Sequence, residues 1–544
     1  MLNNPCRQTI EHLPWRFFYW GGVGILFVWA AWQRFKLPLD LIADPDTWGY
    51  LSPALRKLTG GEFGHPHARN FIYPGFVFLL LRVFGDFRAI TVAQHFFGLL
   101  AGGILLLTWQ RVRVFVAHPL IARRVYYALG LLAAGVFLLA SDPILFEKQL
   151  RPEGVCAFLF SINLYFVIQF SACCFIERRR AASVVYGIAA VFSSILLASA
   201  KPSFWLASIV ALLPIGIMFF RQGWFREKIL LAGGAAASAA LLLLPEHFLA
   251  RNDEASQIFL PATLFVIHAD LIRDQIADDL KHNATVPYSR EWLGRVRVAL
   301  STEIAKSAAT GSRVCSTLGF DPDYLKYEKT SIAAQLRRDF GKNVSSLCAF
   351  YRFYYWRIWR QRPLLLVRKI TRQMRIFYAP TCPAYRQTRS RSLGDEYQRG
   401  VTSLSTELYG ATLTAYRPAT EFINRTKALA QSAPVVQQPA YVRKPLHVLA
   451  RTYLPLLLIA VPSSVAVLLR EKWRRHLGWL AALVVFAYSY NMASCLEVAV
   501  VHSLELGRYV TVQLFFTILA QFLALWFILE LALEMRSSIK ARNA

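Results

Sequence analysis

Long apolar stretches fill both ends of this chain, and their length predicts membrane-spanning helices. A helix needs about 20 mainly apolar residues to cross a hydrocarbon core of about 30 Å. We identify ten such stretches, near residues 17–33, 88–109, 125–141, 154–176, 184–200, 203–220, 229–246, 449–469, 477–497 and 509–533. The first ends in Trp32 and a charged segment instead of a small-residue cleavage site, so we expect a retained span. The predicted fold is an all-α polytopic membrane protein.

Basic residues between the apolar stretches predict the orientation. After every even-numbered stretch the chain carries a group of Lys and Arg: Arg111, Arg113, Arg123, Arg124, Arg178, Arg179, Arg180, Arg221, Arg226, Lys228, Arg470, Lys472, Arg474, Arg475, Arg536, Lys540 and Arg542. Short cytoplasmic loops are enriched in these residues. Both termini are therefore expected in the cytoplasm, and two long segments, 34–87 and 247–448, are expected outside. The expected domains are a transmembrane module over 1–246, an extracytoplasmic, mainly helical region over 247–448, and a second transmembrane module over 449–544.

Composition narrows the class of protein. Hydrophobic residues make up 55% of the 544 residues and charged residues 17%, below the roughly one quarter of soluble globular chains. Eight cysteines are too few for a disulfide scaffold. The net charge of +28 is explained by cytoplasmic loops and a surface facing anionic lipid or lipid phosphate, so no nucleic-acid partner is expected.

Part of this excess charge lies in residues 351–391, which contain eleven basic residues and no acidic one. From Pro363 onward apolar residues recur at helical spacing, while Arg368 and Arg372 share another face. The pattern predicts a basic interfacial helix. Such a helix either rests on lipid headgroups or forms a wall of a site for a lipid phosphate, and the sequence leaves both alternatives open.

Two carboxylates open the first outside segment. Asp44 and Asp46 flank a proline and precede a predicted short helix. Carboxylates in such a place can accept a proton or bind a cation. The alternative is ordinary capping, with Asp46 as the helix N-cap and Asp44 as a turn residue.

The residues that follow resemble a known family. The run Asp46, Tyr50, Ala54 and Gly60, followed by Tyr73-Pro74 and then Gln94, is similar to the start of the GT-C glycosyltransferases. These include protein O-mannosyltransferases, aminoarabinose transferases of lipid A and arabinofuranosyltransferases. The resemblance implies that the acidic residue of the first outside loop is the catalytic base. It also implies a polyprenyl-phosphate sugar as donor.

Further segments fit the resemblance. Arg151 and Glu153 follow the third stretch, Lys201 joins the fifth and sixth, and a segment with His502, Arg508 and Tyr509 precedes the last. In the family pattern a His and an Arg-Tyr pair face the donor phosphate, and acidic and basic residues of the loop after the third span face the cavity. We therefore expect all of these residues, with Lys201 and Tyr73, to bind the donor phosphate or its lipid. A possible donor cavity is assigned to Arg368, Arg372, His65 and His67.

One position departs from the family pattern. Many relatives carry a second acid directly after the base, where this chain has Thr47. A metal role is therefore not carried over, and no cofactor is predicted. His65 and His67 could ligate a metal, but two loop histidines without a fixed third ligand are more often exposed or phosphate-facing. Among Cys315, Cys348 and Cys382 at most one disulfide can form.

The resulting hypothesis is an inverting glycosyltransferase at the outer face of a membrane, expected to be a bacterial inner membrane with a periplasmic active site. Its partners would be the lipid-linked donor, membrane lipids and an acceptor glycan, lipid or protein. The alternatives are a transporter or flippase for lipid-linked sugars and an assembly subunit that binds a glycan. No P-loop or dinucleotide-binding fingerprint is found in the sequence.

Overall fold

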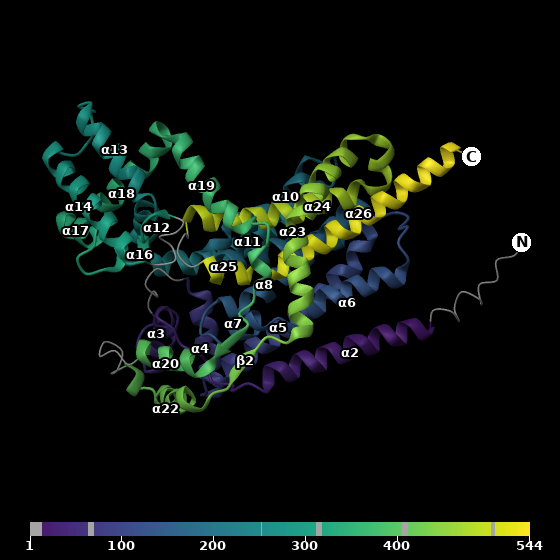
Figure 1. Ribbon diagram of the computed structural model, residues 1–544, viewed down its shortest axis with the longest axis horizontal. Helices are drawn as coiled ribbons and strands as arrows, with labels where there is room; N and C mark the ends of the chain where they lie inside the picture. Colours follow the sequence, from purple (N-terminus) through teal and green to yellow (C-terminus); the bar gives the residue numbers. More distant parts are fainter. Residues whose placement is uncertain are drawn as a thin grey trace, which may run out of the picture.

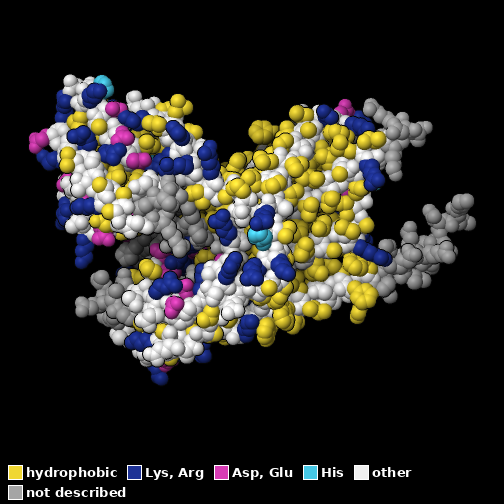
Figure 2. All heavy atoms as spheres, in the orientation of Figure 1, with side chains coloured by type: hydrophobic (Ala, Val, Ile, Leu, Met, Phe, Trp, Pro, Cys, Tyr) yellow, Lys and Arg dark blue, Asp and Glu magenta, His cyan; other side chains and the backbone are white. Residues whose placement is uncertain are grey.

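The computed structural model describes residues 13–63, 70–251, 253–311, 318–404, 412–501 and 506–543. A bundle of long helices runs through the centre and right of Figure 1. Within the described residues eight helical segments are long and apolar enough to cross a membrane: Arg88–Phe115 (α5 and η1), Glu153–Ile176 (α8 and η2), Arg180–Ala200 (α9), Pro202–Phe220 (η3 and α10), Phe225–Ala250 (α11), Ala440–Leu469 (α23), Glu471–Val501 (α24) and Leu514–Ser537 of α26 (Leu514–Asn543). Hydrophobic side chains cover the visible face of this bundle in Figure 2, as a lipid-facing surface requires.

The other two predicted spans form helices that do not meet these criteria. Helix α6 (Arg123–Leu139) has 17 residues, short of the roughly 20 that cross a bilayer. Helix α2 (Leu13–Phe35) is long enough, but four tryptophans and two arginines make it less apolar. Both pack beside the bundle, α2 on α5 and α6, and α6 on α26. The predicted count of ten spans is therefore not confirmed, while the all-α polytopic architecture is.

The two long segments expected on one side of the membrane lie at one end of the molecule. In Figure 1 the helices of both gather at the left, and the described ends of α2 and α26 lie at the right. The upper lobe contains α12 (Glu254–Ile267), α13 (Ala269–Lys281), α14 (Arg290–Ala309), α16 (Pro322–Tyr327), α17 (Ile332–Phe340), α18 (Val344–Gln361) and α19 (Pro363–Phe377). Phe265, Phe350 and Tyr354 are fully buried in its own core. Helices α12 and α13 meet at a bend of 79° and would count as a ninth span if taken together.

The basic stretch 351–391 does not form the single helix predicted for it, whereas the amphipathic part expected from Pro363 onward is α19. Helix α18 ends at Gln361 and α19 begins at Pro363, because proline lacks an N–H and suits a first helical position. After Phe377 the chain is irregular up to η4 (Pro383–Tyr385) and the short strand β1 (Ser390–Ser392). Arg368 and Arg372 are exposed on α19, as their predicted face suggested, but Lys369 beside them is buried and pairs with Asp270 at 2.5 Å.

A lower lobe holds residues 34–87, which we call the first outside segment after their predicted location, against the bundle. It contains α3 (Thr47–Leu58), α4 (Ile72–Phe84), α20 (Leu393–Leu404), α22 (Arg417–Ser432) and the antiparallel strands β1 and β2 (Val435–Gln437). Helix α22 anchors this segment because Arg425 binds Asp40 at 2.6 Å and Asp86 at 3.2 Å. Phe422 stacks on Phe87 with ring centroids 4.6 Å apart. Two further short helices, α7 (Ser141–Phe146) and α25 (Leu506–Val512), lie between the lobes and the bundle.

Candidate functional site

The first outside segment runs beside the turn between α7 and α8. The Ile42 N–H donates to the Lys148 carbonyl at 2.8 Å, and the Leu150 N–H donates to the Ile42 carbonyl at 3.2 Å. This single parallel bridge fixes the register of two segments that lie about a hundred residues apart in sequence. Asp44 lies two residues beyond Ile42 in one segment, and Arg151 lies two residues beyond Gln149 in the other. These two side chains form an ion pair.

Asp44 and Asp46 have different local tasks. The Asp44 Oδ1 accepts the N–H of Asp46 at 2.7 Å and that of Thr47 at 3.1 Å, so it satisfies the first donors of α3. Asp46 occupies the N-cap position but makes no capping hydrogen bond with its side chain. Of the two capping roles considered for these residues, Asp44 therefore fills the turn role and Asp46 does not cap. The Asp46 carboxylate is directed elsewhere.

Asp46 belongs to a cluster of charged side chains, which we call the Asp46 cluster: Asp44, Asp46, Arg151, Glu153, Lys201 and Arg508. Arg508 Nη1 lies 2.7 Å from Asp46 Oδ2, and Arg508 Nε lies 2.8 Å from Glu153 Oε1. Lys201 forms an ion pair with Glu153 and lies 4.6 Å from the ring centroid of Tyr509. Arg508 also donates to the Tyr509 hydroxyl at 3.3 Å. Four segments of the chain thus converge on one site.

Exposure increases across this cluster. The side chain of Glu153 is 1% exposed, that of Lys201 8%, that of Arg508 15% and that of Asp46 31%. The buried carboxylate needs cationic partners, because an unpaired buried charge is strongly destabilising. Glu153 therefore holds Lys201 and Arg508 in place. Asp46 is the most solvent-accessible acid of the Asp46 cluster. The arrangement offers one accessible proton acceptor beside two fixed cations.

Tyr73 lies behind the cluster. Its hydroxyl donates to Gln94 Oε1 at 3.0 Å, and Gln94 Nε2 donates to the carbonyls of Glu147 at 2.8 Å and Gln149 at 3.1 Å. Burial, followed by the charge of Glu153, raises the pKa of Tyr73 well above its usual value. Tyr73 is therefore a neutral donor that positions the turn before α8.

A second buried ion network was missed by the sequence analysis. Arg34, at the end of α2, binds Glu147 through two hydrogen bonds of 2.8 and 2.9 Å, and His95 Nδ1 lies 2.8 Å from the same carboxylate. Gly98 makes room for it, because a Cβ at that position would lie 1.9 Å from Glu147 Oε1. No spacing in the sequence relates these residues, since they are brought together only by the packing of α2, α5 and α7.

The remaining predicted site residues fall into two groups. His65, His67 and His502 lie outside the described residues. Arg368 and Arg372 lie exposed on α19 and form no ion pair within the described part of the chain. These two arginines are predicted to line the donor cavity, but in the described part of the chain they make no contact with the Asp46 cluster.

The described residues also show how candidate metal ligands and cysteines are arranged. Within the described ranges no group of three or more His, Cys, Asp and Glu side chains is arranged to hold a metal ion. Cys348 and Cys382 are free thiols, and Cys315 lies outside the described residues.

Comparison with known proteins adds no relative. No protein-family model, no curated protein and no solved structure matches the chain.

Proposed function

We propose that this protein is an inverting glycosyltransferase of the GT-C type that transfers a sugar from a polyprenyl phosphate to an acceptor hydroxyl at the outer face of a membrane. One observation carries the proposal. Asp46, the residue that the family resemblance assigns as the base, forms a 2.7 Å ion pair with Arg508, which the same resemblance assigns to the donor phosphate. Lys201 and Arg151, which the same resemblance assigns to that phosphate, belong to the same cluster.

The cluster has the groups that the reaction needs. The acceptor oxygen attacks the anomeric carbon of the sugar, and Asp46 takes the proton of that hydroxyl. The bond between the anomeric carbon and the phosphate oxygen breaks, and its electron pair leaves with the lipid phosphate. Arg508 and Lys201 stabilise that anion by charge-assisted hydrogen bonds. A single displacement with one base inverts the anomeric configuration.

The position of the Asp46 cluster supports access to a lipid-linked donor. Glu153 is the first residue of the candidate span formed by α8 and η2, and Lys201 lies between the spans α9 and α10. The cluster is therefore at the ends of spanning helices, where a lipid phosphate would lie. Our proposal places this end in the periplasm of a bacterial inner membrane, with both termini in the cytoplasm.

The experiment is a transfer assay with the purified full chain and a panel of polyprenyl-phosphate sugars that carry hexoses, aminoarabinose or arabinofuranose. We expect release of polyprenyl phosphate from at least one donor. Glu396→Gln on α20 is the matched carboxylate control, because Glu396 lies outside the Asp46 cluster. Absence of release from every donor, together with transbilayer movement of those lipids in proteoliposomes, would replace the transferase by a flippase.

A further inference from the structure

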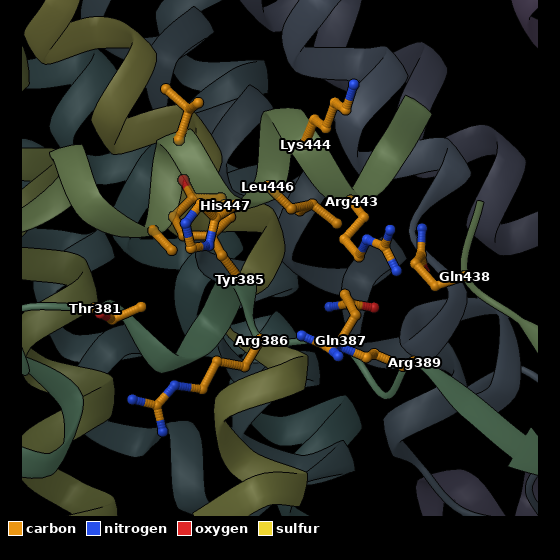
Figure 3. Close-up of a pocket in the computed structure, with 12 residues that line it drawn as sticks. Thr381, Tyr385, Arg386, Gln387, Arg389, Gln438, Arg443, Lys444, Leu446 and His447 are labelled. Atoms are coloured by element: carbon orange, nitrogen blue, oxygen red, sulfur yellow. The ribbon is translucent and has the colours of Figure 1, made fainter. Parts of the chain in front are cut away.

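A pocket of about 720 Å³ lies between the segment after α19 and the first turns of α23. Its lining is Thr381, Tyr385, Arg386, Gln387, Arg389, Gln438, Arg443, Lys444, Leu446, His447, Val448 and Ala450. None of these residues belongs to the Asp46 cluster. Figure 3 shows side chains from both segments around the pocket, with Arg443, Gln387, Arg389 and Gln438 on one side of the view. The proposed transferase function leaves this pocket without a task.

The charge of the lining has one sign. Arg386, Arg389, Arg443, Lys444 and His447 contribute basic groups, and no acidic residue lines the pocket. None of the five forms an ion pair within the described ranges, although many basic residues of the lobes do. Like charges gathered without counter-charges repel one another, so the pocket favours an anion.

Two glutamines of the lining are held in place by backbone donors. Gln438 is 6% exposed, and its Oε1 accepts the Ser141 N–H at 2.8 Å. Gln387 Oε1 accepts the Asp142 N–H at 2.8 Å in the same way. These backbone donors fix which end of each amide is the oxygen. Both Nε2 groups are then left buried and without a partner in the described part of the chain.

The position of the pocket indicates the source of that anion. Arg443, Lys444 and His447 lie in the first turns of α23, which is a candidate membrane span. Further along the same helix Leu458 and Ile459 are exposed apolar residues. Basic residues at the end of a span lie at headgroup depth, while exposed apolar residues beyond them contact acyl chains.

We propose that this pocket binds the phosphate of an anionic membrane lipid, at a second site that shares no residue with the Asp46 cluster. The basic side chains hold the phosphate oxygens, and the acyl chains follow the exposed apolar face of α23. A free inorganic phosphate would fill only a small part of the pocket and would leave most of these donors unused.

The test measures lipid binding to the purified full chain in detergent by native mass spectrometry. Phosphatidic acid is the probe, phosphatidylcholine is the zwitterionic reference, and inorganic pyrophosphate is the soluble competitor. The variants are Arg389→Gln with Arg443→Gln, and separately Gln438→Glu. The second keeps an oxygen for the Ser141 N–H and replaces the free donor by a carboxylate oxygen. Arg297→Gln with Lys329→Gln is the control, because these exposed basic residues lie in the upper lobe away from the pocket.

We expect phosphatidic acid to bind the unsubstituted chain and the control equally, and each pocket variant about tenfold or more weakly. Phosphatidylcholine should bind all four alike. Arg508→Ala, which should weaken polyprenyl phosphate binding at the Asp46 cluster, should leave phosphatidic acid binding unchanged, which separates the pocket from the proposed catalytic site. Binding of phosphatidic acid to both pocket variants as tightly as to the unsubstituted chain would overturn the proposal. Displacement of the lipid by pyrophosphate at equal concentration would also overturn it in favour of a soluble phosphate compound.

Discussion

At the scale of residues, the sequence identified the charged side chains of the site but not their partners. The family resemblance assigns Asp46 as the base and Arg151, Glu153, Lys201 and Arg508 to the donor site, and the sequence places Asp44 beside Asp46 as a second carboxylate. The structure pairs Arg151 with Asp44 and Arg508 with both Asp46 and Glu153. These pairings depend on how helix ends meet in three dimensions, which local spacing does not encode. The sequence also does not show that Asp44 caps the helix while the Asp46 carboxylate points elsewhere.

Arg508 provides the first prediction. Arg508→Ala removes a charge-assisted contact that is typically worth about 1.5–3 kcal/mol, so the affinity for polyprenyl phosphate should fall about tenfold or more. Binding is measured with the purified chain in detergent, and Arg417→Ala on α22 is the control because Arg417 is 91% exposed. Unchanged affinity in Arg508→Ala would place the donor phosphate elsewhere.

Lys148 provides a prediction about pH. Its side chain is fully buried and donates to the carbonyls of Pro38 and Asp40, and burial lowers its pKa to about 7. Between pH 7 and the ordinary lysine value of about 10.4, only the unfolded chain holds this proton. Unfolding then takes up a proton, so the free energy of unfolding rises by up to about 1.4 kcal/mol per pH unit over that window.

Lys148→Met should remove this contribution. The measurement is the free energy of unfolding by denaturant in detergent at several pH values between about 7 and 10, for the chain, for Lys148→Met and for the exposed-lysine control Lys281→Met. The control should keep the rise of the unsubstituted chain. A rise of the same size in Lys148→Met would show that this lysine is charged in the folded state.

At the scale of elements, the length of an apolar stretch predicts a helix more reliably than it predicts a membrane span. Helices cover all ten apolar stretches, because a long apolar run has few alternatives to a helix. Helices α2 and α6 nevertheless fall short in apolar character or length. The prediction of one helix over 351–391 fails because the basic residues continue past Pro363, whereas the helical backbone is interrupted there. Helix α4 and the β1–β2 pair were not expected, since each is stabilised by contacts distant in sequence.

The upper lobe gives a prediction at this scale. Arg357 on α18 binds Asp279 on α13 through two hydrogen bonds of 2.8 and 2.7 Å, and the Asp279 side chain is 3% exposed. Arg357→Ala leaves that carboxylate buried with Gln275 as its remaining partner. We expect a loss of about 3 kcal/mol in the free energy of unfolding. The control Arg360→Ala, an exposed residue of the same helix, should change it by less than about 0.5 kcal/mol. Equal losses in both variants would contradict the account of this ion pair.

At the scale of the whole molecule, the two lobes lie at one end of the bundle, and the described chain ends lie at the other (Figure 1). The predicted orientation can be tested with single cysteines at Arg297 in the upper lobe, Arg417 in the lower lobe and Arg474 on α24. A membrane-impermeant maleimide should label the first two in intact cells and the third only after permeabilisation. The unsubstituted chain gives the background from the native cysteines. Labelling of position 474 alone in intact cells would invert the topology and move the proposed site to the cytoplasm.

The central claim is that Asp46 accepts a proton during sugar transfer, and it is tested most directly by comparing chemistry with binding in Asp46→Asn. The amide keeps the size of the carboxylate but cannot take the proton, a difference worth about 10²–10⁴ in rate. We expect Asp46→Asn to bind polyprenyl phosphate and to unfold near the temperature of the unsubstituted chain, while release of polyprenyl phosphate from the donor falls by about two to four orders of magnitude. Asp44→Asn, which keeps an oxygen for the Asp46 and Thr47 N–H groups, should lose less activity. Near-normal release by Asp46→Asn would contradict the account.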